Sequence, residues 1–189
     1  MGKEKMLHDA DIRDSLCFYL EEQYREVRFF EELTIGKSRA DIVMVTRESM
    51  IGIEIKSDAD TYTRLSKQVK NYNRFFDYNI LVVGSTHVAH AMEHVPNNWG
   101  IISVEELDGK LDFYELRSPK ITKAKLKTQL QLLWRRELAQ IQATNHLHKY
   151  AGKSRKFVEE YILTTLDPDT LKKQLLDTLF ERDYTIFDD

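Results

Sequence analysis

Residues 40–56, ADIVMVTRESMIGIEIK, decide the fold class of this chain of 189 residues. Two apolar, β-branched segments, ADIVMVT and MIGIEIK, flank the polar turn RES and predict a β-hairpin. Successive side chains of a strand point to opposite faces, so the three isoleucines of MIGIEIK share one face. That face is expected to enter the core, whereas the other face carries Glu54 beside Lys56.

The surrounding sequence predicts a helix, three strands, a helix and a further strand, followed by edge strands. The segment NILVVG is almost wholly apolar, which is typical of a strand buried on both faces. This order predicts an α/β fold with a mixed central sheet flanked by helices. The expected helices are 11–24 and 60–75, and the expected strands are 27–33, 40–46, 50–56, 79–84, 101–104 and 111–116. Ser57 to Asp60 is interpreted as the N-capping segment of the second helix.

After Pro119 the pattern becomes helical. Leucines between 126 and 141 predict one long helix, and residues 157–162 predict a second. Asp167-Pro168 supplies an N-cap and a proline at the first position of a third helix. The expected domains are therefore an α/β core over 1–118 and an all-α extension over 119–189.

The composition excludes several classes of protein. Hydrophobic residues make up 42% and charged residues 31%, which is typical of a folded domain. A single cysteine, Cys17, excludes an internal disulfide framework and a multi-cysteine zinc site. No apolar segment resembles a secretory signal or is long enough to span a bilayer, so the expected location is cytoplasmic, away from the membrane.

The net charge of −3 hides an uneven distribution. Residues 119–156 contain ten Lys or Arg but one acid, Glu137, whereas the segments on both sides are acidic overall. A cationic block of this kind binds phosphates independently of sequence, so the extension is expected to contact DNA. The alternative is a solvated helix face. The candidate DNA-binding residues here are Lys123, Lys127, Arg135, Arg136, Lys153, Arg155 and Lys156.

The hairpin also contains the candidate catalytic and metal-binding residues. Asp41 and Glu54 lie on successive strands, at a spacing that brings both carboxylates to one end of the sheet. Two converging carboxylates can hold Mg²⁺, which prefers oxygen ligands. Lys56 lies two residues beyond Glu54 on the same face, where it can stabilise charge at a phosphate. The alternative is structural, with Glu54 and Lys56 forming an ion pair.

Asp41, Glu54-x-Lys56 and Gln68-x-x-x-Tyr72 together resemble the motifs of the PD-(D/E)xK nuclease superfamily. The Gln68-x-x-x-Tyr72 pair resembles the added motif of the RecB-like and phage exonuclease branch. The segment from Glu32 through Lys56 is similar to small bacterial and phage proteins of the superfamily, including a group linked to DNA repair. Ala40 stands where the motif has proline. The resemblance covers roughly residues 10–116 and implies a restriction-endonuclease-like core.

The resemblance also implies roles for individual residues. Asp41, Glu54 and the carbonyl of Ile55 would be ligands of Mg²⁺ or Mn²⁺, and Lys56 would be the catalytic lysine. Glu32 would be a further acid and metal ligand, with Glu21 or Glu22 as its rivals. Gln68 and Tyr72 would help position the scissile phosphate or the attacking water. Arg39 and Arg64 would contact DNA.

The expected function is a Mg²⁺- or Mn²⁺-dependent deoxyribonuclease that hydrolyses DNA phosphodiester bonds with a Mg-activated water. It would act in DNA repair, phage or defence metabolism, alone, as a homodimer or in a larger repair or phage complex. The alternative is a catalytically inactive DNA-binding or adaptor protein that retains the nuclease fold. A third class, a helical interaction module with a small sheet, predicts neither metal nor DNA binding. The sequence leaves endonuclease and exonuclease activity open.

Overall fold

The structure, a computed structural model, describes residues 7–184 and contains one six-stranded mixed sheet with the strand order β1-β2-β3-β4-β5-β6. Strands β1, β2 and β3 form an antiparallel meander, β4 and β5 run parallel to β3, and β6 returns antiparallel. The predicted hairpin and the predicted mixed sheet are confirmed. The strands are β1 (Arg28–Ile35), β2 (Ser38–Val45), β3 (Met50–Lys56), β4 (Tyr78–Gly84), β5 (Gly100–Leu107) and β6 (Lys110–Arg117).

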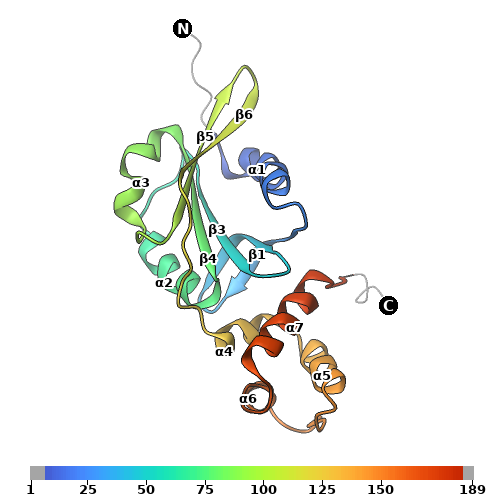
Figure 1. Ribbon diagram of the computed structural model, residues 1–189. Helices are drawn as coiled ribbons and strands as arrows, with labels where there is room; N and C mark the ends of the chain where they lie inside the picture. Colours follow the sequence, from blue (N-terminus) through green and yellow to red (C-terminus); the bar gives the residue numbers. More distant parts are fainter. Residues whose placement is uncertain (1–6, 185–189) are drawn as a thin grey trace.

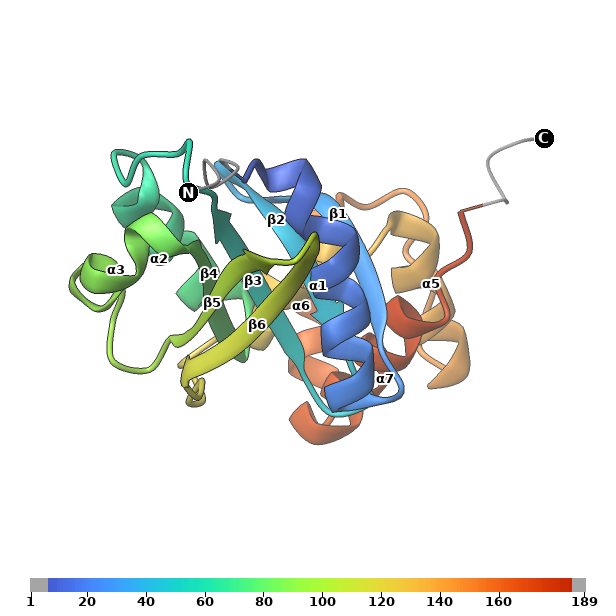
Figure 2. The ribbon, with the colours of Figure 1, turned by 90° about the horizontal axis from the view of Figure 1, so that it is seen from above.

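Helices cover both faces of the sheet (Figures 1 and 2). Helix α1 (Asp9–Tyr24) lies on one face, where its buried residues pack against the isoleucines of β3, as the alternation predicted. Helix α2 (Leu65–Phe75) lies on the opposite face. On that face Gly52 is required, because a Cβ there would lie 2.1 Å from the Phe76 ring. The short helices η1 (Ser85–His87) and α3 (Val88–His94) connect β4 to β5.

After β6 an extended connection, residues 118–125, leads into a helical segment that packs against the α2 face of the sheet. Figure 1 shows these helices gathered at the end of the molecule opposite the β5–β6 turn. Their buried leucines form one continuous core with the valines of β2. No helix in residues 7–184 is long and apolar enough to cross a membrane. The elements are α4 (Leu126–Gln129), η2 (Leu130–Leu132), α5 (Arg135–Thr144), α6 (Arg155–Thr165) and α7 (Pro168–Phe180).

Two expected helices differ in the structure. The second begins at Leu65, not at residue 60, and its N-cap Arg64 makes no side-chain capping bond. The Asp60 carboxylate instead accepts bonds from the amide and hydroxyl of Ser57, at 2.9 and 2.7 Å, in a closed loop. The capping interpretation was therefore wrong, because this pair stabilises the loop between β3 and α2.

The single helix expected over residues 126–141 is divided. The backbone becomes extended at Leu133 and Trp134, and α5 starts afresh at Arg135. Glu137 caps the new helix by accepting a bond of 2.5 Å from the Trp134 amide. A capping bond inside the predicted segment favours two helices over one. By contrast, the predicted start of α7 is confirmed, since Asp167 accepts a bond from the Thr170 amide.

Candidate active site

The hairpin places Asp41 and Glu54 side by side. In the β2–β3 ladder Ile42 lies opposite Ile53, so the next pair outward is Asp41 and Glu54. Directly opposed residues of antiparallel strands share one face of the sheet. The Asp41 carboxylate is fixed by a bond of 2.8 Å that its Oδ2 accepts from the backbone amide of Ile55. Both acids therefore face α2 at the end of β3.

Three side chains hold the carboxylate of Glu54, which is fully buried. The Lys56 ammonium donates to Oε1 at 2.6 Å, and the Gln68 amide donates to the same oxygen. The Tyr72 hydroxyl donates to Oε2 at 2.8 Å. A carboxylate has about four acceptor positions, so these three bonds leave room for one more ligand.

The two carboxylates perturb the neighbouring pKa values. Burial, followed by the negative charge of Glu54, raises the pKa of Asp41 to about 7. The amide of Ile55 and the positive charge of Lys56 oppose this shift. Burial and the charge of Glu54 also raise the pKa of Tyr72 well above its usual value, so its hydroxyl remains a hydrogen-bond donor. Such perturbed acids in a cleft are typical of functional sites.

A pocket of about 550 Å³ opens over these groups. Its floor contains Asp41, Glu54, Ile55, Lys56 and Gln68, which the sequence analysis selected. Tyr72 does not line it; this tyrosine is fully buried and acts through Glu54. The rim is basic, since Lys37, Arg39, Arg64 and Lys67 all contribute to it. The arrangement suits an anionic ligand above paired carboxylates.

Asp9, at the first turn of α1, also lines the pocket, and the sequence analysis did not select it. Its Oδ2 accepts from Arg13, whereas its buried Oδ1 has no hydrogen-bond partner among residues 7–184. The Oε1 of Gln68 is likewise buried and without a partner. The signal in the sequence was the acidic start of the first helix, a feature that helix capping equally explains.

Glu32, the predicted additional acid, does not line the pocket. In β1, Glu32 lies between the partners of Ile42 and Ala40, so it is level with Asp41. Its backbone departs from strand geometry at this point, since its φ of 53° is in the left-handed region. Its carboxylate is paired with the guanidinium groups of Arg13 and Arg39. The rivals Glu21 and Glu22 are exposed near the far end of α1, about 18 Å along the helix from Asp9.

The donor set of the pocket fits a hard divalent cation. Asp41 and Glu54 supply carboxylates, Ile55 lines the pocket beside them, and Asp9 offers a buried carboxylate oxygen. Mg²⁺ is commonly held by one or two carboxylates, with water and substrate phosphate completing its coordination. Within residues 7–184, no three His, Cys, Asp or Glu side chains come together as a complete metal site. The protein therefore offers part of a coordination shell.

Residues 4–188 match the sequence profile of a family described as bacteriophage P4 protein cII. The chain belongs to that family. Among solved structures, this P4 cII family protein is similar to SfsA of Pyrococcus furiosus in complex with Ca²⁺. The TM-score is 0.40 and the identity is 14%, over 60% of this chain and 67% of that chain. A search of curated protein sequences finds no match.

The predicted DNA-binding residues of the P4 cII family protein are found in two settings. The guanidinium group of Arg135 donates to the carbonyls of Tyr150 and Lys153, at 3.1 and 2.8 Å. That of Arg155 pairs with Glu159 and donates to the carbonyl of Leu133 at 2.6 Å. These two arginines therefore hold helices together. The other five are exposed. Of these, Lys127 pairs with Glu160, and Arg136 lies over the Trp134 ring.

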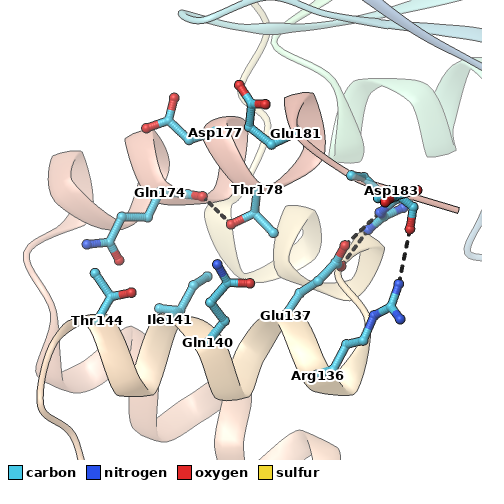
Figure 3. Close-up of a pocket in the computed structure, with 11 residues that line it drawn as sticks. Arg136, Glu137, Gln140, Ile141, Thr144, Gln174, Asp177, Thr178, Glu181 and Asp183 are labelled. Atoms are coloured by element: carbon cyan, nitrogen blue, oxygen red, sulfur yellow. Dashed lines mark hydrogen bonds and ion pairs between the residues drawn. The ribbon is translucent and has the colours of Figure 1, made fainter. Parts of the chain in front are cut away.

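A second hollow of about 480 Å³ lies between α5 and α7 of the P4 cII family protein (Figure 3). Asp177 and Glu181 stand along its α7 side, where both pair with Arg47. On the α5 side, Glu137 forms a buried ion pair with Arg182 at 2.6 Å. This hollow is rich in acids, so it is a poor site for phosphate.

Proposed function

We propose that the pocket over Asp41, Glu54 and Lys56 is the active site of a divalent-cation-dependent DNA nuclease. The observation that carries the proposal is one buried cluster in which two carboxylates, a lysine and a glutamine converge beneath a basic rim. Paired acids with a lysine suit phosphodiester hydrolysis better than they suit a structural ion pair. The raised pKa of Asp41, caused by burial and by the charge of Glu54, accords with such a site.

The proposal assigns the core to the PD-(D/E)xK superfamily with a restriction-endonuclease-like fold. The order helix, antiparallel meander, helix and parallel strand supports this assignment. The position of the motif supports it as well, since the acids lie at the hairpin and Gln68 and Tyr72 reach Glu54 from the following helix. The helical segment after residue 118 is the proposed extension.

In this proposal Asp41, Glu54 and the Ile55 carbonyl hold Mg²⁺ or Mn²⁺, and Asp9 takes the place considered for Glu32. A bound divalent cation supplies positive charge to a phosphoryl oxygen and lowers the pKa of a bound water. The Lys56 ammonium stabilises the negative charge that develops on the scissile phosphate. Gln68 and Tyr72 fix the orientation of Glu54. Arg39 and Arg64, on the rim, bind the flanking phosphates.

The test is a cleavage assay on linear, circular, single-stranded and branched DNA with Mg²⁺ or Mn²⁺. The wild-type protein should cleave at least one substrate. Asp41→Asn, Glu54→Gln and Lys56→Ala should each lower the rate by two or more orders of magnitude. Glu22→Gln, an exposed acid at the other end of α1, is the matched control and should retain the activity.

The same assay distinguishes the alternative function. A protein that binds Mn²⁺ in calorimetry but cleaves no substrate would be a DNA-binding or adaptor protein with a nuclease fold. Wild-type rates in all three active-site variants would reject the assigned residues. If the protein bound neither metal nor DNA, both functions would be rejected.

A further inference from the structure

Two segments without any acidic residue lie against each other on the α2 side of the molecule. Residues 61–76 contain four Lys or Arg and no Asp or Glu, and residues 116–136 contain seven and none. The Lys125 amide donates to the Arg74 carbonyl at 3.3 Å, and the Thr122 amide donates to the Asp77 carbonyl at 2.8 Å. Figure 1 shows α2 beside α4, which follows this connection.

Five cations of these two segments are exposed on neighbouring surfaces. On α2, Lys67, Lys70 and Arg74 are exposed and fall on one face at helical spacing. In the extended connection, Thr122 and Ala124 are partly buried while Lys123 and Lys125 are exposed, as alternation along an extended chain requires. We call Lys67, Lys70, Arg74, Lys123 and Lys125 the basic track.

The charge of the basic track is not neutralised by neighbours. Among residues 7–184, no ion pair involves any of its five members. By contrast, Lys127, Arg155 and Arg182 of the helical segment each pair with a glutamate. The hollow in Figure 3 is lined by four acids and two arginines, so it adds no net positive charge. The basic track is therefore a run of exposed positive charge over α2 and the connection that no ion pair of the described chain compensates.

The basic track leads into the candidate active site. Lys67 belongs both to the track and to the rim of the pocket. From Lys67, α2 extends about 12 Å to its end at Phe75, toward the connection. We infer that the basic track binds the phosphate backbone of duplex DNA and guides one strand to the pocket. This inference rests on the proposed function for the cleavage step, but the binding step is independent of it.

The absence of exposed rings on the track favours duplex over single-stranded DNA. Single-strand binders combine a basic groove with aromatic side chains on which bases stack. The exposed aromatic residues of the described chain are Phe18, Tyr24, Tyr114, Phe157 and Tyr184. None of them belongs to α2 or to the connection.

The test compares two triple variants with the same loss of charge. The track variant is Lys70→Gln, Lys123→Gln and Lys125→Gln, which leaves the pocket lining intact. The control variant is Arg25→Gln, Lys110→Gln and Lys173→Gln, three exposed cations outside the basic track and outside residues 119–156. Fluorescence anisotropy with a short duplex and with one of its strands, in EDTA and at several salt concentrations, gives affinity and salt slope. Circular dichroism verifies that each variant is folded.

The wild-type protein should bind duplex more tightly than single strand. The track variant should weaken duplex binding at least tenfold and reduce the salt slope by about 2 to 3, since each lost phosphate contact removes about 0.9. The control variant should change the slope by less than about 1. An unchanged track variant, equal losses in both variants, or tighter binding of single strand would overturn the inference.

Cleavage by the same variants separates this inference from the proposed function. If the wild-type protein cleaves DNA and the track variant binds and cleaves normally, the inference about the basic track is wrong, whereas the proposed nuclease function is supported. If no protein cleaves but the track variant still loses duplex affinity, the track stands and the nuclease proposal fails.

Discussion

The Asp41 carboxylate lies level with that of Glu54 on the neighbouring strand and is held there by the amide of Ile55, at 2.8 Å. Placing two acids together in a partly desolvated pocket opposes their ionisation, and it raises the pKa of Asp41 to about 7. Keeping these two carboxylates together therefore lowers the stability of the folded protein. In the proposed function, a bound cation offsets that loss.

The first prediction concerns pH. The pKa of Asp41 is higher in the folded protein than its ordinary value of 3.8, so its contribution to stability is complete below about pH 4. That contribution is lost as the pH rises through 7. Asp41→Asn should therefore stabilise the metal-free protein at pH 8, by on the order of 2 kcal/mol, and much less at pH 5.

Urea denaturation in EDTA at pH 5 and pH 8 measures this difference. The exposed Asp112→Asn serves as the control and should show no such dependence. An Asp41→Asn protein that is less stable than the wild type at pH 8 would contradict the electrostatic account. The same variant should lose the stabilisation that Mn²⁺ gives to the wild-type protein.

The second prediction concerns the hydroxyl of Tyr72. Tyr72→Phe keeps the ring packing but removes the donor to Glu54 Oε2 inside the core. Leaving a buried carboxylate oxygen without its donor should cost about 1–3 kcal/mol and lower the cleavage rate. Tyr114→Phe, at an exposed position of β6, is the control. Equal unfolding midpoints and rates for both variants would show that the hydroxyl has no such role.

Most of the sheet could be predicted because its signals are local. The alternation in MIGIEIK gives the core face of β3, and the apolar segment NILVVG gives a strand buried on both faces. The juxtaposition of Asp41 and Glu54 follows from a short hairpin, whose register the turn restricts. The local sequence was therefore sufficient to predict the centre of the candidate site.

The remaining features depend on contacts distant in sequence. Glu32 is level with Asp41 in the ladder, but Arg13, from α1, pairs with its carboxylate. Asp9 reaches the pocket because α1 crosses the sheet, and no periodicity reveals that approach. Arg135 and Arg155 resemble a DNA-binding surface in sequence, yet they bond to backbone carbonyls. Composition shows that charge is present but not where it is neutralised.

The third prediction concerns Gly52. In Gly52→Ala the new methyl group would meet the Phe76 ring at 2.1 Å and the Tyr72 ring at 2.7 Å, so α2 must move away from the sheet. Overpacking of this kind costs about 1–3 kcal/mol, and the shift should also displace Gln68 and Tyr72 from Glu54. Thermal unfolding and cleavage should both be impaired. Gly152→Ala, where nothing lies within 4 Å, should leave both unchanged, and similar behaviour of the two variants would contradict the packing argument.

The fourth prediction concerns the ion pair beneath the hollow of Figure 3. The Arg182 guanidinium is buried between the Glu137 carboxylate and the Trp134 ring. Arg182→Ala should destabilise the protein by about 3–5 kcal/mol, because it leaves a buried carboxylate without its partner. Glu160→Ala breaks the exposed pair with Lys127 and should cost about 1 kcal/mol or less. Equal losses in urea denaturation would show that burial does not determine the strength of these pairs.

The most direct test of the central claim is anomalous diffraction from crystals soaked in Mn²⁺. The account predicts one strong anomalous peak between the carboxylates of Asp41 and Glu54, within coordination distance of both, and no peak there in Asp41→Asn crystals. A wild-type map without a peak at that position, or with the same peak in the variant, would contradict the assigned metal site.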